Sequence, residues 1–164
     1  MQSMMASSPP KAGVEIFERI LAAPVGLVVL EGGDSAALLN DFRAIARHTG
    51  QAVYLWQPDQ GLGSLRDAHA RVPGCQRLGN ALRYMQQSMH FGVYLLAHLE
   101  LPLSAMDATL LRQLARAPSG HVRRVVLLDA PQALIDHLGE TAARISSELN
   151  LPVRPRLRDG RWVT

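Results

Sequence analysis

The sequence is poor in residues that carry redox chemistry and in long apolar runs. Cys75 is the only cysteine in 164 residues, so the chain cannot form an internal disulfide or supply the cysteine ligands of a zinc or iron–sulfur site. The longest apolar runs, 26–30 and 125–128, are far too short to cross a bilayer, and the N-terminus has no secretory apolar core. We therefore expect a cytoplasmic protein with no membrane span.

Lysine is almost absent as well. Lys11 is the only lysine, and every other strong base is an arginine. This bears on residues 28–35, where an apolar run breaks at two glycines and continues as a helical pattern. Such a junction can bind phosphate through N–H groups at the helix N-terminus, and the candidate ligands here are Gly32, Gly33, Asp34 and Ser35. A P-loop also needs a lysine at this place, so the sequence predicts the scaffold without its catalytic part.

The composition predicts one domain. A chain of this length with 48% apolar residues can bury one good core, and a second independent core is not expected. Residues 1–12 are rich in Ser, Pro and Met, and we expect a disordered leader there, followed by a single α/β domain over 13–164. The net charge of +3 is too small to imply a nucleic-acid partner by itself.

Strand and helix patterns alternate along the chain. A helical stripe from Val14 ends before Pro24; strands are expected at 25–31, 52–56, 91–96 and 122–128, and further helices at 35–48, 76–89, 104–117 and 132–149. Residues 57–74 are expected to form a long loop, and Asp159-Gly160 predicts a C-terminal β-hairpin. The order predicts a mainly parallel, doubly wound sheet of about five strands, Rossmann-like or degenerate P-loop, with helices on both faces.

Mostly acidic residues follow the expected strands. Because ligands of open parallel sheets bind at the carboxyl ends of the strands, the candidate metal ligands are Glu31, Asp59, His98 and Glu100. Carboxylates suit Mg²⁺, although such residues also serve as loop solubilisers and helix caps, and a cap explains Asp34 fully.

Residues 31–38 resemble the glutamate motif that opens Toprim domains of primases and topoisomerases. That resemblance implies a Mg-dependent nuclease or phosphotransferase. The family's Asp-x-Asp pair is replaced here by His98-Leu99-Glu100 or by Gln57-Pro58-Asp59, which weakens the expected Mg²⁺ site.

Arginines cluster at two places. One pair is Arg123-Arg124, and the C-terminal group is Arg154, Arg156, Arg158 and Arg161. Such clusters form either a solvated face or a site for anions or nucleic acid. The Arg-x-x-Asp spacing at 156–159 also resembles sites where some bacterial proteins hold cyclic di-GMP. Nucleic acid or a cyclic dinucleotide is therefore an alternative partner.

Three segments together resemble one family. Residues 26–149 resemble the P-loop-less amino-terminal domain of certain bacterial and plastid AAA proteins. The resemblance is carried by a strand followed by Glu-Gly-Gly-Asp, by the segment Val53–Leu62 and by the strand Phe91–Leu96. Where that family's third strand ends in aspartate, this chain has Ala97-His98.

The resemblance implies a stand-alone, degenerate RecA-like domain. Its expected role is that of a regulatory or scaffold subunit in a bacterial cytoplasmic assembly, without catalysis. The expected partners are other proteins, with a second copy of the chain as one option. No cofactor is expected, and Mg²⁺ enters only under the Toprim alternative. The segment 57–74 and the C-terminal arginines are the expected contact surfaces.

Overall fold

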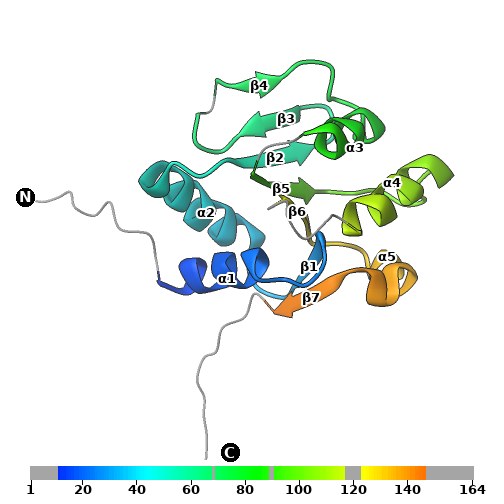
Figure 1. The fold of residues 1–164 in the computed structure, drawn as a ribbon, viewed down its shortest axis with the longest axis horizontal. Helices are drawn as coiled ribbons and strands as arrows, with labels where there is room; N and C mark the ends of the chain where they lie inside the picture. Colours follow the sequence, from blue (N-terminus) through cyan, green and yellow to red (C-terminus); the bar gives the residue numbers. More distant parts are fainter. Residues whose placement is uncertain (1–10, 68, 89–90, 117–122, 147–164) are drawn as a thin grey trace, which may run out of the picture.

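The computed structural model describes residues 11–67, 69–88, 91–116 and 123–146 (Figure 1). Its sheet has seven strands in the order β4-β3-β2-β5-β6-β1-β7. The strands are β1 (Leu27–Glu31), β2 (Val53–Gln57), β3 (Gly61–Ser64), β4 (Arg71–Val72), β5 (Gly92–Ala97), β6 (Arg123–Leu128) and β7 (Ala143–Ser146). The helices are α1 (Lys11–Leu21), α2 (Ser35–Thr49), α3 (Leu78–Gln87), α4 (Ala105–Ala115) and α5 (Gln132–Leu138), followed by the short turn η2 (Gly139–Thr141).

Five of the strands are parallel, which confirms the predicted fold class. β2, β5, β6, β1 and β7 run in one direction, and β3 and β4 extend the β2 edge in antiparallel pairing. Helices α1 and α2 cover one face of the sheet, and α3, α4 and α5 cover the other. Two helices on one face and three on the other make the sheet doubly wound, as right-handed crossovers require.

Burial on both faces explains the apolar strands. Along β1, Leu27 and Val29 pack into the core beneath α3, α4 and α5, while Val28 and Leu30 pack into the core beneath α1 and α2. The alternation follows from the two-residue period of a strand. A strand covered on both sides reads as a continuous apolar run, which is why the sequence located the parallel strands β1, β2, β5 and β6 correctly.

Arg123 begins β6 and faces the α3 side of the sheet. Only 8% of its surface is exposed, and its guanidinium donates to the carbonyl oxygens of Met85 (2.9 Å) and Gln86 (3.1 Å) in the last turn of α3. The last carbonyls of a helix lack partners within the helix and carry partial negative charge. Arg123 therefore caps α3, and burial lowers the pKa of its guanidinium.

Arg124 does the same for α1 on the opposite face. It donates to the carbonyls that end this helix and its following turn, those of Ile20, Leu21 and Ala23, at 3.0–3.1 Å. Successive residues of a strand point to opposite faces, so adjacent arginines reach different helices. The expectation of a solvated or anion-binding pair at Arg123-Arg124 is wrong, because both guanidinium groups are turned inward onto main-chain oxygens.

The segment 57–74 was expected to be a loop, and this is wrong for much of it. β3 pairs with β2, with Leu62 opposite Trp56, and β4 pairs with β3. The Trp56 indole N–H donates to the carbonyl of Cys75 (2.9 Å), which closes this segment onto the sheet. Short strands containing glycine give little periodic signal, so tertiary pairing and not local pattern forms them.

The expected helix 132–149 is also corrected. α5 ends at Leu138, Gly139 adopts φ 51°, and β7 then pairs in parallel with β1. Glycine at a helix C-terminus stops the helix, and this stop signal outweighs the apolar pattern beyond it. The predicted C-terminal hairpin lies outside the described residues.

Replacing Arg124 with alanine should destabilise the fold. The change removes the donor to three main-chain carbonyls at the end of α1. One hydrogen bond to a charged group is worth about 1.5–3 kcal/mol, and because these bonds are only part-buried, water can replace much of what the three contribute together. We expect the urea midpoint to fall with an unchanged m-value, corresponding to a loss of about 2–3 kcal/mol. Arg47→Ala is the matched control, since Arg47 is exposed in the last turn of α2. Equal midpoints for the two variants would contradict the capping role.

Candidate functional site

The turn after β1 is built from two glycines and a helix cap. Gly32 and Gly33 have φ values of 77° and 75°, which glycine adopts without strain. The Asp34 carboxylate then accepts hydrogen bonds from the amides of Ala36 (2.9 Å) and Ala37 (3.3 Å), which confirms it as the cap of α2. These N–H groups belong to the set that a phosphate would use at a helix N-terminus, and here a carboxylate already occupies two of them.

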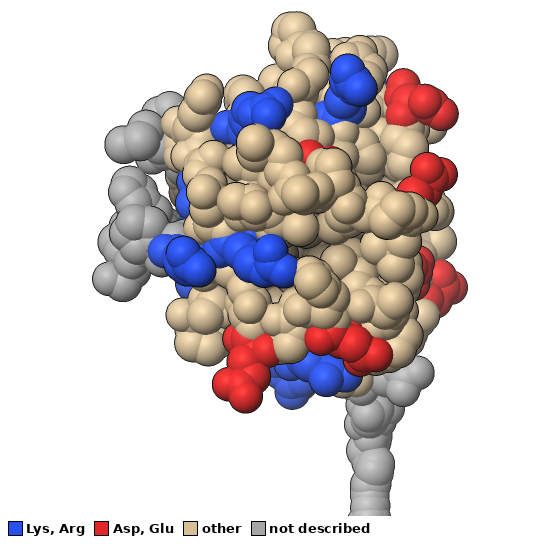
Figure 2. Space-filling model, turned by 90° about the vertical axis from the view of Figure 1, so that its right-hand side faces the viewer, with Lys and Arg blue, Asp and Glu red and all other residues tan. Residues whose placement is uncertain are grey.

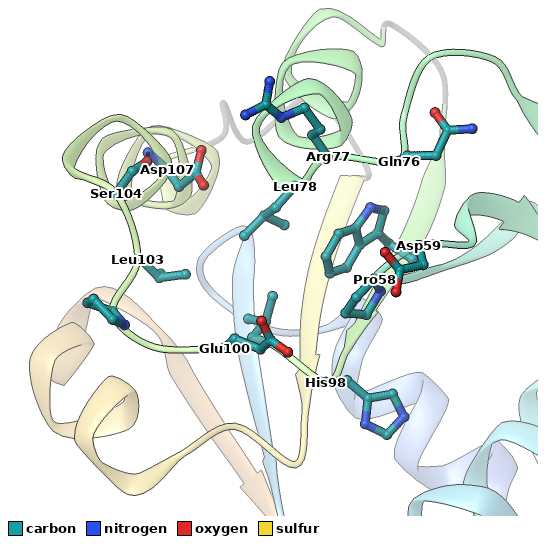
Figure 3. A pocket seen from close by; sticks show the side chains of 13 residues that line it. Pro58, Asp59, Gln76, Arg77, Leu78, His98, Glu100, Leu103, Ser104 and Asp107 are labelled. Atoms are coloured by element: carbon teal, nitrogen blue, oxygen red, sulfur yellow. Dashed lines mark hydrogen bonds between the residues drawn. The ribbon is translucent and has the colours of Figure 1, made fainter.

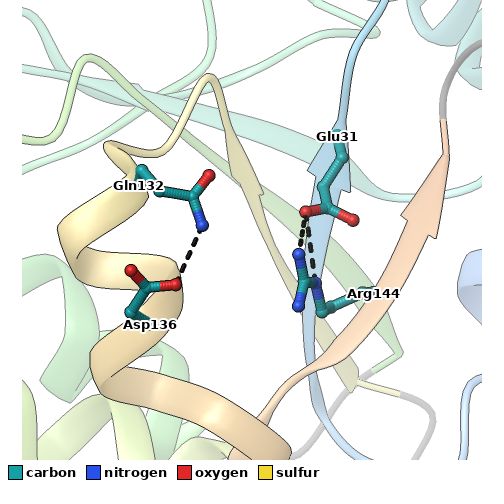
Figure 4. Close-up of polar contacts among 4 residues, drawn as sticks. All are labelled: Glu31, Gln132, Asp136 and Arg144. Atoms are coloured by element: carbon teal, nitrogen blue, oxygen red, sulfur yellow. Dashed lines mark hydrogen bonds and ion pairs between the residues drawn. The ribbon is translucent and has the colours of Figure 1, made fainter.

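Ser35 and Glu31 lie on either side of that turn. Ser35 is the first residue of α2. Glu31 ends β1 and pairs with Arg144 of the edge strand β7, whose Nε and Nη2 atoms lie 3.1 and 2.5 Å from the Glu31 Oε2 atom (Figure 4). The hydrogen bond to this carboxylate raises the pKa of the Arg144 guanidinium. Glu31 is thus directed across the sheet toward β7.

The other three candidate metal ligands lie together at a pocket of about 300 Å³. Asp59 comes from the loop after β2, and His98 and Glu100 from the loop after β5 (Figure 3). The imidazole of His98 points away from the two carboxylates. In the part of the chain that the structure describes, no three His, Cys, Asp or Glu side chains are grouped closely enough to hold a metal ion. The pocket therefore gathers three predicted residues and leaves Glu31 outside.

Helices α3 and α4 supply the other wall of this pocket. Arg77 precedes α3, and Asp107 lies in the first turn of α4. Ser104 caps α4 by accepting from the Asp107 amide at 3.0 Å. Sequence reasoning missed this wall because it listed only residues that follow strands, although Ser104-x-x-Asp107 is a helix-start signature that could have located it.

Gly79 of α3 lies against the Asp107 side chain of α4. A Cβ atom at Gly79 would lie 2.9 Å from the Asp107 Oδ1 atom, closer than ordinary packing permits. A larger residue at position 79 would therefore make the Asp107 carboxylate, the end of its side chain, shift from its present place in the pocket.

Left-handed backbone conformations recur along this edge of the sheet. Asp59, His98 and Asp129 have φ values of 70°, 59° and 52°, and they follow the neighbouring strands β2, β5 and β6. Non-glycine residues adopt this conformation at a cost, and such strain concentrates at binding and catalytic sites. The strained turns and the pocket together make this edge the candidate functional site.

The C-terminal arginines 154, 156, 158 and 161 lie outside the described residues. Among the described ones, no helix is both long and apolar enough to span a bilayer.

The chain matches a family model described as "SpoVK-like AAA ATPase, N-terminal domain" over residues 14–145, a range that runs from α1 into β7. Neither the curated proteins nor the solved structures contain a match.

Removing the α2 cap should have a modest and specific cost. Asp34→Ala leaves the amides of Ala36 and Ala37 without their acceptor, and we expect a loss of about 1 kcal/mol in the free energy of unfolding. Asp34→Ser keeps a capping oxygen and should lose only a few tenths of that value. Denaturant titration of both variants measures the difference; identical stabilities would show that the cap contributes nothing.

The turn at His98 offers a test of backbone strain. Glycine adopts the left-handed conformation freely, whereas alanine does not, so His98→Gly should be more stable than His98→Ala by about 1 kcal/mol. Thermal unfolding of the two variants provides the comparison. An alanine variant as stable as the glycine variant would rule out strain at this position.

Proposed function

This chain belongs to the family of N-terminal domains of SpoVK-like AAA ATPases, and we propose that it is a non-catalytic domain that regulates or scaffolds an assembly through protein contacts. It is an inactive relative of the P-loop fold in this proposal. Nucleotide hydrolysis, which the family description attaches to the ATPase as a whole, is not the task of this domain.

The observation that supports this most strongly is the position of the Asp34 carboxylate. It lies on the first-turn amides of α2, bonded to Ala36 and Ala37, and brings a negative charge to the place where a phosphate would sit. A phosphate would have to displace this cap and overcome charge repulsion. With no lysine in residues 12–164 to offset that repulsion, we infer that Gly32 and Gly33 form a turn and not a phosphate cradle.

The carboxylates at the strand ends support the same interpretation. A Mg-dependent phosphotransferase would need Glu31 to act with Asp59 or Glu100, whereas Glu31 is engaged by Arg144 of β7. The pair is about half exposed, so its contribution to stability is small, but its geometry directs Glu31 away from the pocket. No observation in the described residues favours the phosphotransferase over a binding role.

We expect no nucleotide turnover. Phosphate release from ATP or GTP in the presence of Mg²⁺ should stay at the level of a buffer blank, for the parent chain and for Glu31→Gln alike. Turnover above that level that Glu31→Gln abolishes would refute the non-catalytic assignment and restore the Toprim-like alternative.

A further inference from the structure

Two neighbouring hollows lie along the loop that joins β5 to α4. The first is the pocket of about 300 Å³ described above. The second, of about 280 Å³, is lined by Leu101, Pro102, Leu103, Ala108, Ala133, Leu134 and His137. Both are lined by Pro102 and Leu103, so the two hollows adjoin. We call the two together the α4 groove.

The first hollow is acidic although the chain is basic. Asp59, Glu100 and Asp107 line it, against a single guanidinium, that of Arg77. Among the described residues, none of these three carboxylates has an ion-pair or hydrogen-bond partner. In a chain of net charge +3, this local excess of unpaired negative charge is suited to a cationic group. On this side of the molecule, acidic side chains lie along the right-hand margin and also along the lower edge, where they adjoin basic ones (Figure 2).

The second hollow is apolar and open. Leu101 at its rim is 42% exposed, and Met106 of the adjoining α4 is 54% exposed. Leu101, which lines this hollow, is thus one of the three large apolar side chains that are exposed in the described part of the chain. Exposed apolar surface next to a hollow marks an interaction site. Each hollow is at or below the lower limit for drug-sized ligands, so each is suited to a single side chain.

We propose that the α4 groove binds an extended segment of a partner protein that carries an arginine or lysine two residues from a leucine-sized side chain. In an extended segment, side chains two residues apart point the same way, so one can enter each hollow. Arginine suits the first hollow best, because its planar fork pairs with carboxylates. This inference rests on the proposed function, for which it names the partner's chemistry.

The direct test is a titration of the ¹⁵N-labelled full-length chain with short peptides, followed by amide shifts. The probe is an acetylated, amidated pentapeptide, glycine-leucine-glycine-arginine-glycine. We expect saturable shifts confined to residues around 98–108 and the start of α3. Two control peptides replace the arginine with glutamate or the leucine with serine. Both should bind more weakly, and the glutamate peptide should give no saturable shift.

Charge-neutralising variants locate the acidic hollow. Glu100→Gln with Asp107→Asn keeps side-chain shape and should weaken binding of the arginine peptide about three- to tenfold. The matched control is Glu15→Gln with Glu18→Gln, two exposed carboxylates on α1 across the sheet, and it should leave binding unchanged. Unshifted amide spectra of the free variants will show that each remains folded.

Several results would overturn the proposal. Among them are the absence of a saturable shift with the arginine peptide, shifts spread over other surfaces, equal binding of the glutamate peptide, and equal weakening by both double variants. A peptide with the sequence of residues 151–164 is a further test. If it shifts the same amide signals and binds at least tenfold more tightly than the arginine pentapeptide, the occupant of the groove is this arginine-rich segment of the chain itself. That result would also contradict a separate partner. If the peptides fail to bind and no nucleotide turnover is found, the non-catalytic assignment still stands. Nucleotide turnover would refute that assignment whether or not the peptides bind.

Discussion

The arrangement of helices on both sides of the sheet depends on two adjacent guanidinium groups at the start of the central strand β6. Arg123 caps α3 on one face, and Arg124 caps α1 on the other. Each arginine satisfies carbonyls that a helix cannot satisfy itself, so Arg123 is buried and Arg124 half-buried without a carboxylate partner among the described residues. The two arginines attach a helix on each face at the amino ends of the parallel strands. The turns and the pocket lie at the opposite edge, at the carboxyl ends of these strands.

At that opposite edge, two carboxylates of the chain are engaged by other groups of the chain itself. Asp34 takes amides at the start of α2, and Glu31 binds Arg144. The accessible pocket of about 300 Å³ lies farther along this edge, at the ends of β2 and β5 and the starts of α3 and α4. The two hollows at this edge are lined by acidic and apolar side chains, a combination that we propose is suited to a polypeptide.

The sequence predicted those features that have a local cause. Apolar runs located the doubly covered strands, and the cap at Asp34 located the start of α2. The pairing of β3 with β2 and the strand β7 depend on contacts between distant segments, which short periodic patterns do not encode. The arginine pair of β6 was misjudged for the same reason, since its partners lie about 37 and 104 residues away. At the site, Asp59, His98 and Glu100 were found because they follow strands, while Arg77 and Asp107 were missed because they begin helices.

The central claim is that the glycine turn after β1 does not bind phosphate, because the Asp34 carboxylate already occupies amides that a phosphate needs. The most direct measurement is an amide-shift titration of the full-length chain with Mg-ATP, following Gly32, Gly33, Ala36 and Ala37. We expect these four amide signals of the parent chain to remain unshifted at millimolar nucleotide. Their positions should match those in a control sample of the same chain that contains salt and no nucleotide. Saturable shifts at these amides, lost on competition with inorganic phosphate, would contradict the claim and make the turn a working phosphate site.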